Sequence, residues 1–201
     1  MLEGSSRNLP LLQGHQHLGF RCTGCGNCCR SLRVTLTHRD LERLAAASGE
    51  PYAALVDWLG PSEVDMSGEP EGFVELAQGR RLMVLAQRDG ACRWLDSEQR
   101  CRVYAARPAD CRAFPFSFEV LEAEAGLSLS LLSGTACDYA LDGQQELSQV
   151  RDHDQARWRE LAEYQALVAR WNRLAKHRRM LGHRARGAVD FLDFIARGEA
   201  P

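Results

Sequence analysis

Residues 20–30 read Phe20-Arg-Cys-Thr-Gly-Cys-Gly-Asn-Cys-Cys-Arg30, so four cysteines fall within eight positions. Packing does not call for sulfur at this density, whereas metal binding does, because two thiolates two residues apart can approach one ion at about 2.3 Å each. Gly24, Gly26 and Asn27 stand where such a turn needs left-handed or bridge-region backbone angles. The segment is therefore predicted to hold a metal through Cys22, Cys25, Cys28 and Cys29.

The adjacent pair Cys28-Cys29 adds a geometric expectation. Neighbouring side chains of an extended backbone point in opposite directions and rarely ligate one ion together. We therefore expect the two thiolates to face different metals, or different corners of one cluster.

Four more cysteines follow, in Gly90-Ala-Cys-Arg-Trp-Leu-Asp96, in Cys101-Arg-Val-Tyr-Ala-Ala-Arg-Pro-Ala-Asp-Cys-Arg-Ala-Phe-Pro-Phe116 and in Thr135-Ala-Cys-Asp-Tyr139. Eight thiolates suffice for two four-sulfur sites. A disulfide framework is the alternative for an even cysteine count, but such frameworks are typical of shorter secreted chains. The predicted ligands are Cys22, Cys25, Cys28, Cys29, Cys92, Cys101, Cys111 and Cys137, with burial as an isolated thiol the alternative for Cys137.

These motifs resemble the YkgJ-type cysteine-cluster family (CxxCxxCC), described as a zinc- or iron-chelating domain. The resemblance covers roughly residues 18 to 140 and rests on the segment from Phe20 to Cys29 and on the segment from Cys92 to Phe116. The family usually continues after its last cysteine with Pro-Gly, whereas this chain has Cys137-Asp-Tyr. The resemblance implies a metal-binding domain and little more.

The metal itself is zinc or iron, the latter alone or in a 4Fe-4S cluster. The C-x-x-C-x-x-C spacing matches a bacterial ferredoxin run, whose fourth ligand lies elsewhere in the chain. Zinc accepts the same loop, and soft thiolates suit both metals. The triple run is less usual in structural zinc sites and so favours iron.

Composition indicates an ordinary globular chain of 201 residues, 45% apolar and 26% charged. No apolar run approaches the length of a membrane span, and no export signal is visible at the start, so we expect a cytoplasmic protein. Residues 1–150 carry 14 Lys and Arg against 20 Asp and Glu, while residues 151–186 carry 10 against 4. The two parts have opposite net charge.

Hydrophobic periodicity predicts an α+β fold, a small metal-stapled core of short strands and helices followed by a long C-terminal helical segment. Residues 1–142 form the expected metal-binding domain and residues 143–201 a helical extension packed on it. The expected elements, in chain order, are a helix from the capping box Thr37-His-Arg-Asp40 to Gly49, a helix from Pro51 to Trp58, a hairpin over 73–86, a hairpin over 116–132, a helix from about Gln144 to Met180 and a final helix over 188–196.

The basic stretch Arg170-Trp-Asn-Arg-Leu-Ala-Lys-His-Arg-Arg179 has two interpretations. Contact with nucleic-acid phosphates is one. A solvated helix face, with cations placed favourably near the helix C-terminus, is the preferred one. The long helix could also pair with a second copy of the chain or with a protein partner.

The leading hypothesis is a metal-binding protein that holds zinc or iron through clustered thiolates. A redox or methyl-transfer enzyme that uses the cluster is the alternative, because the larger flagellin lysine methylases are similar to this family in the cysteine cluster. The chain shows no G-x-G-x-x-G loop, Walker motif or nucleophile elbow. An adaptor that binds nucleic acid or protein through the basic helix ranks third.

Overall fold

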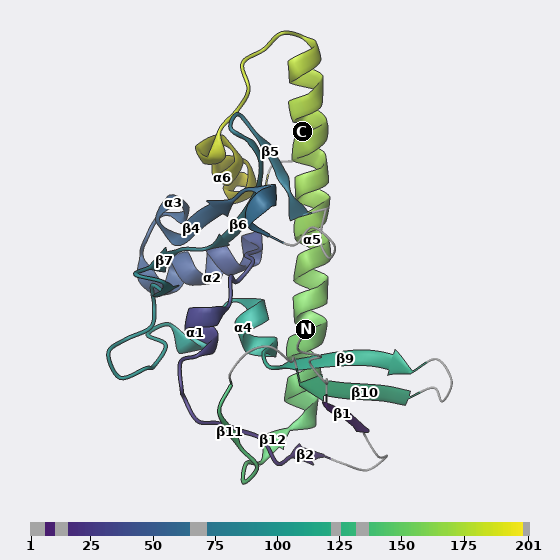
Figure 1. The fold of residues 1–201 in the computed structure, drawn as a ribbon. Helices are drawn as coiled ribbons and strands as arrows, with labels where there is room; N and C mark the ends of the chain where they lie inside the picture. The colour runs from purple at the N-terminus through teal and green to yellow at the C-terminus, as the bar shows by residue number, and fades with distance from the viewer. Residues whose placement is uncertain (1–6, 11–15, 65–71, 122–125, 132–136, 199–201) are drawn as a thin grey trace. The chain divides into compact units, whose positions relative to one another are not determined.

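A computed structural model describes residues 7–10, 16–64, 72–121, 126–131 and 137–198. The fold is α+β with a long C-terminal helix, as predicted (Figure 1). The chain divides into two compact units, and each combines segments that are distant in the sequence. Unit 1 consists of residues 1–32, 88–104 and 109–158, and unit 2 of residues 33–87, 105–108 and 159–201.

Short antiparallel strands build the described part of unit 1. The hairpin predicted over 116–132 is confirmed, and most of its turn lies outside the described residues. The strand pairs are β1 (Arg7–Pro10) with β10 (Gly126–Leu131), β10 with β9 (Phe116–Leu121), β3 (Arg21–Cys22) with β11 (Tyr139–Ala140) and β2 (His17–Leu18) with β12 (Gln145–Glu146).

The core of unit 1 is a small apolar cluster beneath the hairpin. Phe116, Leu129, Leu147 and Val150 are all buried in it. The ring of Phe20 meets Phe116 edge-on with centroids 4.8 Å apart, so the residue that opens the cysteine run is anchored in this core. The other short elements wholly within unit 1 are α1 (Cys28–Ser31), β8 (Ala91–Cys92) and α4 (Ala109–Ala113), while β7 (Gln87–Arg88) and η3 (Tyr104–Ala106) each have residues in both units.

In unit 2, α2 (His38–Ser48) begins and ends as its sequence predicts. The Thr37 hydroxyl accepts a hydrogen bond from the Asp40 backbone N–H at 3.2 Å, and the Asp40 carboxylate accepts one from the Thr37 N–H at 2.8 Å. This reciprocal capping box satisfies two helix-end donors. Gly49 ends the helix in the left-handed region, at φ 72°.

The helix predicted from Pro51 to Trp58 is wrong beyond its first turn. The observed helix, α3 (Tyr52–Leu55), gives way to β4 (Val56–Leu59), which lies in a sheet of order β4-β6-β5. All four residues of β4, three of them apolar or aromatic, pair with β6 (Gly79–Leu85), and this cross-strand packing outweighs local helix propensity. β5 (Val74–Leu76) and β6 confirm the hairpin predicted over 73–86, and η1 (Pro61–Glu63) follows β4.

The long helix α5 (Leu147–Met180) begins later than predicted, because residues 145 and 146 form β12 instead. Along this helix Trp158 is 54% exposed and lies under the Arg157 guanidinium. In unit 2 the helix buries Tyr164, Val168 and Trp171, which follow one another at steps of four and three residues. The last helix is α6 (Ala188–Arg197), whose Phe191 ring lies 5.3 Å from the Trp171 ring.

A buried ion network ties α2 to the part of α5 in unit 2. The Arg43 guanidinium contacts the Asp40 carboxylate at 2.5 Å and both Glu160 oxygens at 2.6 and 2.9 Å. The Asp40 side chain is 1% exposed and that of Glu160 10%. Two carboxylates at such low exposure depend on the guanidinium for their charge balance.

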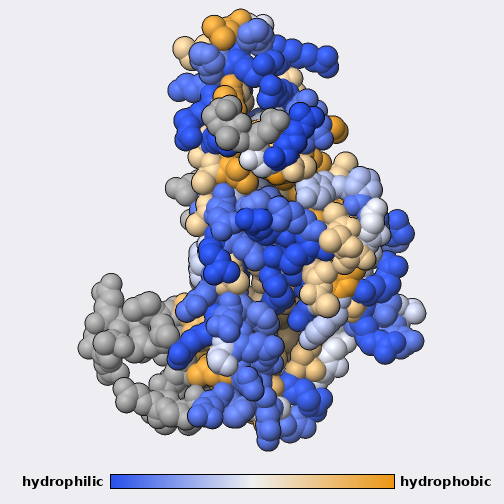
Figure 2. Space-filling model, turned by 180° about the vertical axis from the view of Figure 1, so that it is seen from behind, coloured by the Kyte–Doolittle hydropathy of each residue, from blue (hydrophilic) through white to orange (hydrophobic). Residues whose placement is uncertain are grey.

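None of the described helices is long and apolar enough to cross a membrane. On the face drawn in Figure 2, hydrophilic residues predominate and hydrophobic residues form small separate groups.

Candidate metal centre

All eight cysteines are among the described residues, and all eight lie in unit 1. Each is a thiol rather than half of a disulfide, and seven of them are half-buried. Three separate segments of the chain deliver them, so the fold of unit 1 gathers the residues that the sequence singled out.

The first four thiols follow one another along a strand, a turn and a short helix. Cys22 ends β3, opposite Tyr139 of β11. Gly24 and Gly26 then adopt left-handed angles, with φ of 72° and 69°, as the turn requires. Asn27 differs from the expectation, since it takes right-handed helical angles as the N-cap of α1.

The expectation that Cys28 and Cys29 face different metals assumed an extended backbone, which the structure does not have at this pair. The backbone there is helical rather than extended, and the two sulfurs lie 4.0 Å apart. Two thiolates on one tetrahedral ion, each about 2.3 Å from it, stand about 3.8 Å apart. The observed spacing therefore suits two ligands of one ion.

Cys92 at the end of β8 joins this pair. Its thiol is hydrogen-bonded to Cys29, and this bond lowers the pKa of Cys92 to about 7. The pKa of Cys29 is raised, first by its hydrogen bond with Cys28 and then by that with Cys92. Of Cys29 and Cys92, Cys92 is therefore the thiol closer to its thiolate form at neutral pH.

The segment after Cys92 folds back on itself and carries Cys101. The Cys92 carbonyl accepts from Leu95 N–H at 3.0 Å, and Leu95 then pairs with Cys101 in an isolated antiparallel bridge. The side chain of Arg30 donates to that of Gln99, which joins α1 to this loop. Sequence reasoning missed Gln99, because nothing in its neighbourhood marks it as a contact of the first cysteine run.

Cys137 lies beside the first run. Burial, and after it the nearby Cys25, Cys22 and Cys28 thiols, raise the pKa of Cys137 to about 11. The Thr23 hydroxyl, between the first two cysteines, donates to the Asp138 carbonyl at 2.6 Å. Cys137 is therefore not an isolated buried thiol, and Thr23 is a second contact that the sequence did not reveal.

A bidentate ion pair between Arg21 and Asp142 links β3 to the segment just after β11. Arg21 donates from Nε and Nη2 to the two Asp142 oxygens at 2.8 and 2.9 Å. Gly143 comes so close to the backbone of Phe20 that a Cβ there would overlap the Phe20 carbonyl group. The ends of the cysteine-bearing segment are thus held together by a side-chain clamp and a tight backbone contact.

The last candidate ligand of unit 1 is Cys111. Cys111 is half-buried in α4. Arg102, the residue after Cys101, places its guanidinium over Trp94 and donates to the Arg93 carbonyl at 2.9 Å.

As the side chains are placed, no three His, Cys, Asp or Glu side chains of the described residues converge to hold one metal ion. The chemistry of the donor set nevertheless fits zinc or iron, because eight thiols lie in one unit. One pair of them, Cys28 and Cys29, is already spaced like two ligands of a tetrahedral ion. Small rotations of neighbouring thiols on binding are expected where metal binding and folding are coupled.

Searches of curated proteins and of solved structures found no match. A family model described as "CxxCxxCC: Putative zinc- or iron-chelating domain" matches residues 21–142, more than half of the chain. The matched range begins at Arg21 and ends at Asp142, the two residues of the clamp. With its eight thiols inside that range, the chain belongs to the CxxCxxCC family.

Proposed function

We propose that this protein binds zinc or iron through the cysteine thiolates of unit 1. The observation that carries the proposal is the contact cluster of Cys28, Cys29 and Cys92, which joins two distant segments of the chain through their sulfurs. A thiol whose pKa is lowered to about 7 is ready to lose its proton to a metal at neutral pH.

The remaining thiols complete the donor set. Cys22, Cys25 and Cys137 form a second neighbourhood, and Cys28 acts on the pKa values of both Cys92 and Cys137. Cys101 and Cys111 are the further sulfurs of the unit. Eight thiolates would hold two ions with four sulfurs each, or one iron-sulfur cluster with sulfurs to spare.

The direct test is anaerobic purification followed by elemental analysis and a visible absorption spectrum. We expect zinc or iron bound in a whole-number ratio to the chain. Visible sulfur-to-iron charge-transfer bands with acid-labile sulfide would assign a cluster, iron without sulfide a mononuclear site, and a colourless protein with zinc a zinc site. A fully folded, metal-free protein that takes up neither metal under anaerobic conditions would refute the proposal.

A substitution in the cysteine run provides the link to folding. Cys25→Ser should lower the metal content and the melting temperature together, because structural thiolate sites contribute folding free energy on the order of 10 kcal/mol. Thr23→Val is a suitable control, since it keeps every sulfur and removes only the hydroxyl that donates to the Asp138 carbonyl. Unchanged metal content and melting in Cys25→Ser would contradict the assignment of that thiol.

A further inference from the structure

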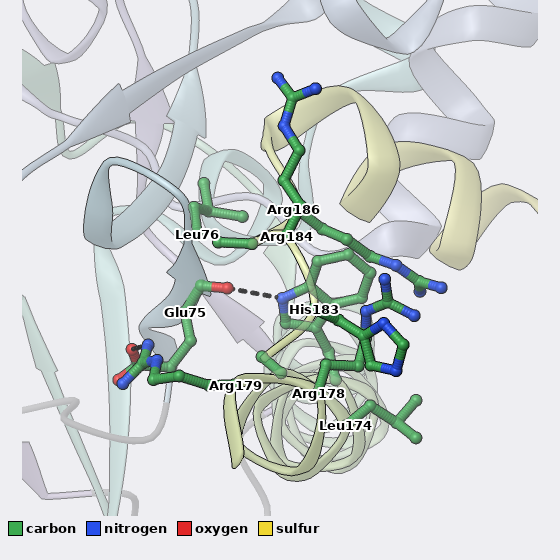
Figure 3. Close-up of a pocket in the computed structure, with 11 residues that line it drawn as sticks. Glu75, Leu76, Leu174, Arg178, Arg179, His183, Arg184 and Arg186 are labelled. Carbon is green, nitrogen blue, oxygen red and sulfur yellow. Dashed lines mark hydrogen bonds and ion pairs between the residues drawn. The ribbon is translucent and has the colours of Figure 1, made fainter. Parts of the chain in front are cut away.

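Unit 2 contains a pocket that the thiol chemistry does not use. It lies between the C-terminal end of α5, the strand β5 and the segment that follows the helix (Figure 3). It is small, with a cavity volume of about 40 Å³, and it opens to solvent. We call it the basic pocket, because the charged side chains that line it are Arg178, Arg179, His183, Arg184, Arg186 and Glu75.

A helix-ending turn brings these cations together. Gly182 adopts φ 72°, and the N–H groups of Gly182 and His183 donate to the carbonyls of Arg179 and Arg178 at 3.1 and 3.0 Å. The chain then reverses, and the Arg186 carbonyl accepts from Ala77 N–H at 2.7 Å. Because backbone donors satisfy these helix-end carbonyls, the arginine side chains are not needed there.

The charges around the basic pocket are unbalanced. Four arginines line it together with a single carboxylate, Glu75. That carboxylate is shared between two ion pairs, with Arg179 at 3.6 Å and with Arg80 at 3.7 Å. Nε of Arg178 is buried without a hydrogen-bond partner in the described part of the chain. With one carboxylate for four guanidinium groups, the lining carries an excess of positive charge that a bound anion would reduce.

The floor of the basic pocket is apolar and fixed. Trp171 is 1% exposed, and its indole N–H already donates to the Glu75 carbonyl at 2.8 Å (dashed in Figure 3). The Arg186 guanidinium lies over the Trp171 ring, 5.6 Å from its centroid. Because the Trp171 ring is buried and Arg186 already lies over it, recognition of a ligand would rest on the charged rim.

We propose that the basic pocket binds a phosphate group of a small phosphorylated molecule. Guanidinium groups present planar pairs of N–H donors that match phosphate oxygens, and several of them can surround one phosphate. The concave shape favours a small phosphate ester or pyrophosphate over the extended backbone of a nucleic acid. This site is independent of the metal chemistry proposed above.

Calorimetric titration of the full, metal-loaded chain with inorganic pyrophosphate tests the proposal at about 0.15 M salt, where exposed charges more than about 8 Å apart are largely screened. The pocket variant is Arg178→Gln/Arg184→Gln. The matched control is Arg173→Gln/Lys176→Gln, which removes two charges from the same basic stretch outside the pocket. We expect the pocket variant to weaken binding about tenfold or more, and the control by less than about twofold.

Three results would overturn the proposal: no binding of pyrophosphate by the wild-type chain, equal weakening by the pocket and control variants, or tighter binding of a single-stranded oligouridylate that both variants weaken alike. The last result would assign the cations to an extended nucleic-acid surface. Arg184→Gln alone serves as a second variant, because its exposed side chain can be changed without disturbing the core, and it should still weaken pyrophosphate binding measurably. Metal content measured on every variant keeps this result separate from the thiol proposal.

Discussion

Cys28 and Cys29 offer the sharpest prediction about the metal centre, because their geometry decides between one shared ion and two separate ones. We consider Cys28→Ser, Cys29→Ser and the double variant. If both sulfurs bind one ion, each single substitution disrupts the same site, and the double substitution removes nothing further. If they bind different ions, the two losses add.

The magnitude follows from the sulfur positions. A tetrahedral ion with bonds of about 2.3 Å separates its thiolates by about 3.8 Å. The two sulfurs lie 4.0 Å apart on the first turn of α1, so only a slight side-chain rotation would bring both onto one ion. We therefore expect each single variant and the double variant to lose the same one metal equivalent per chain.

Native mass spectrometry of anaerobically prepared protein counts the ions directly, and elemental analysis identifies them. Ser31→Ala is the matched control, since it lies on the same helix and removes a hydroxyl that donates to the Asn27 carbonyl at 2.9 Å without removing a sulfur. It should retain the wild-type metal content. A double variant that loses two equivalents, one more than either single variant, would refute the shared ion.

Three further predictions concern stability. Arg43→Met should lower the free energy of unfolding by about 3 kcal/mol in a denaturant titration, because it leaves buried carboxylates without their guanidinium, whereas Arg39→Met, at an exposed pair, should cost less than about 1 kcal/mol. Burial lowers the pKa of His38, so the unfolded chain binds a proton that the folded chain does not, and stability should fall as the pH drops below about 6.5. His38→Gln should flatten this dependence of the unfolding free energy on pH, and an unchanged profile would contradict this account. Gly143→Ala should destabilise the chain and reduce its metal content, since the new Cβ overlaps the Phe20 carbonyl, and wild-type melting would disprove that contact.

Local signals predicted the elements whose ends are set by their own residues. The capping box at Thr37 and the glycine at position 49 defined α2, and the turn around Gly79 defined the hairpin of unit 2. In contrast, residues 56–59 form β4 because β6 offers them a pairing edge, which no local pattern announces. The same reasoning explains the late start of α5, whose expected first residues pair with β2.

The site divides in the same way. The density and spacing of the cysteines marked them in the sequence as the expected metal ligands, since few other uses of sulfur need such a pattern. Spacing could not say which sulfurs are neighbours, and the backbone at Cys28-Cys29 is helical rather than extended as assumed from the sequence. The contacts of Thr23 and Gln99 also depend on segments more than sixty residues away, so only the folded chain reveals them.

The sequence by itself determined the cysteine pattern that places the chain in the CxxCxxCC family and indicated an α+β fold, because residue type, spacing and hydrophobic periodicity are local properties. The tertiary structure decided which thiols meet, how β3 and β11 close the cysteine-bearing segment, and that the cations at the end of α5 and just after it line a pocket. These are consequences of pairing between distant segments, whose energies come from contacts that no single stretch of the chain contains.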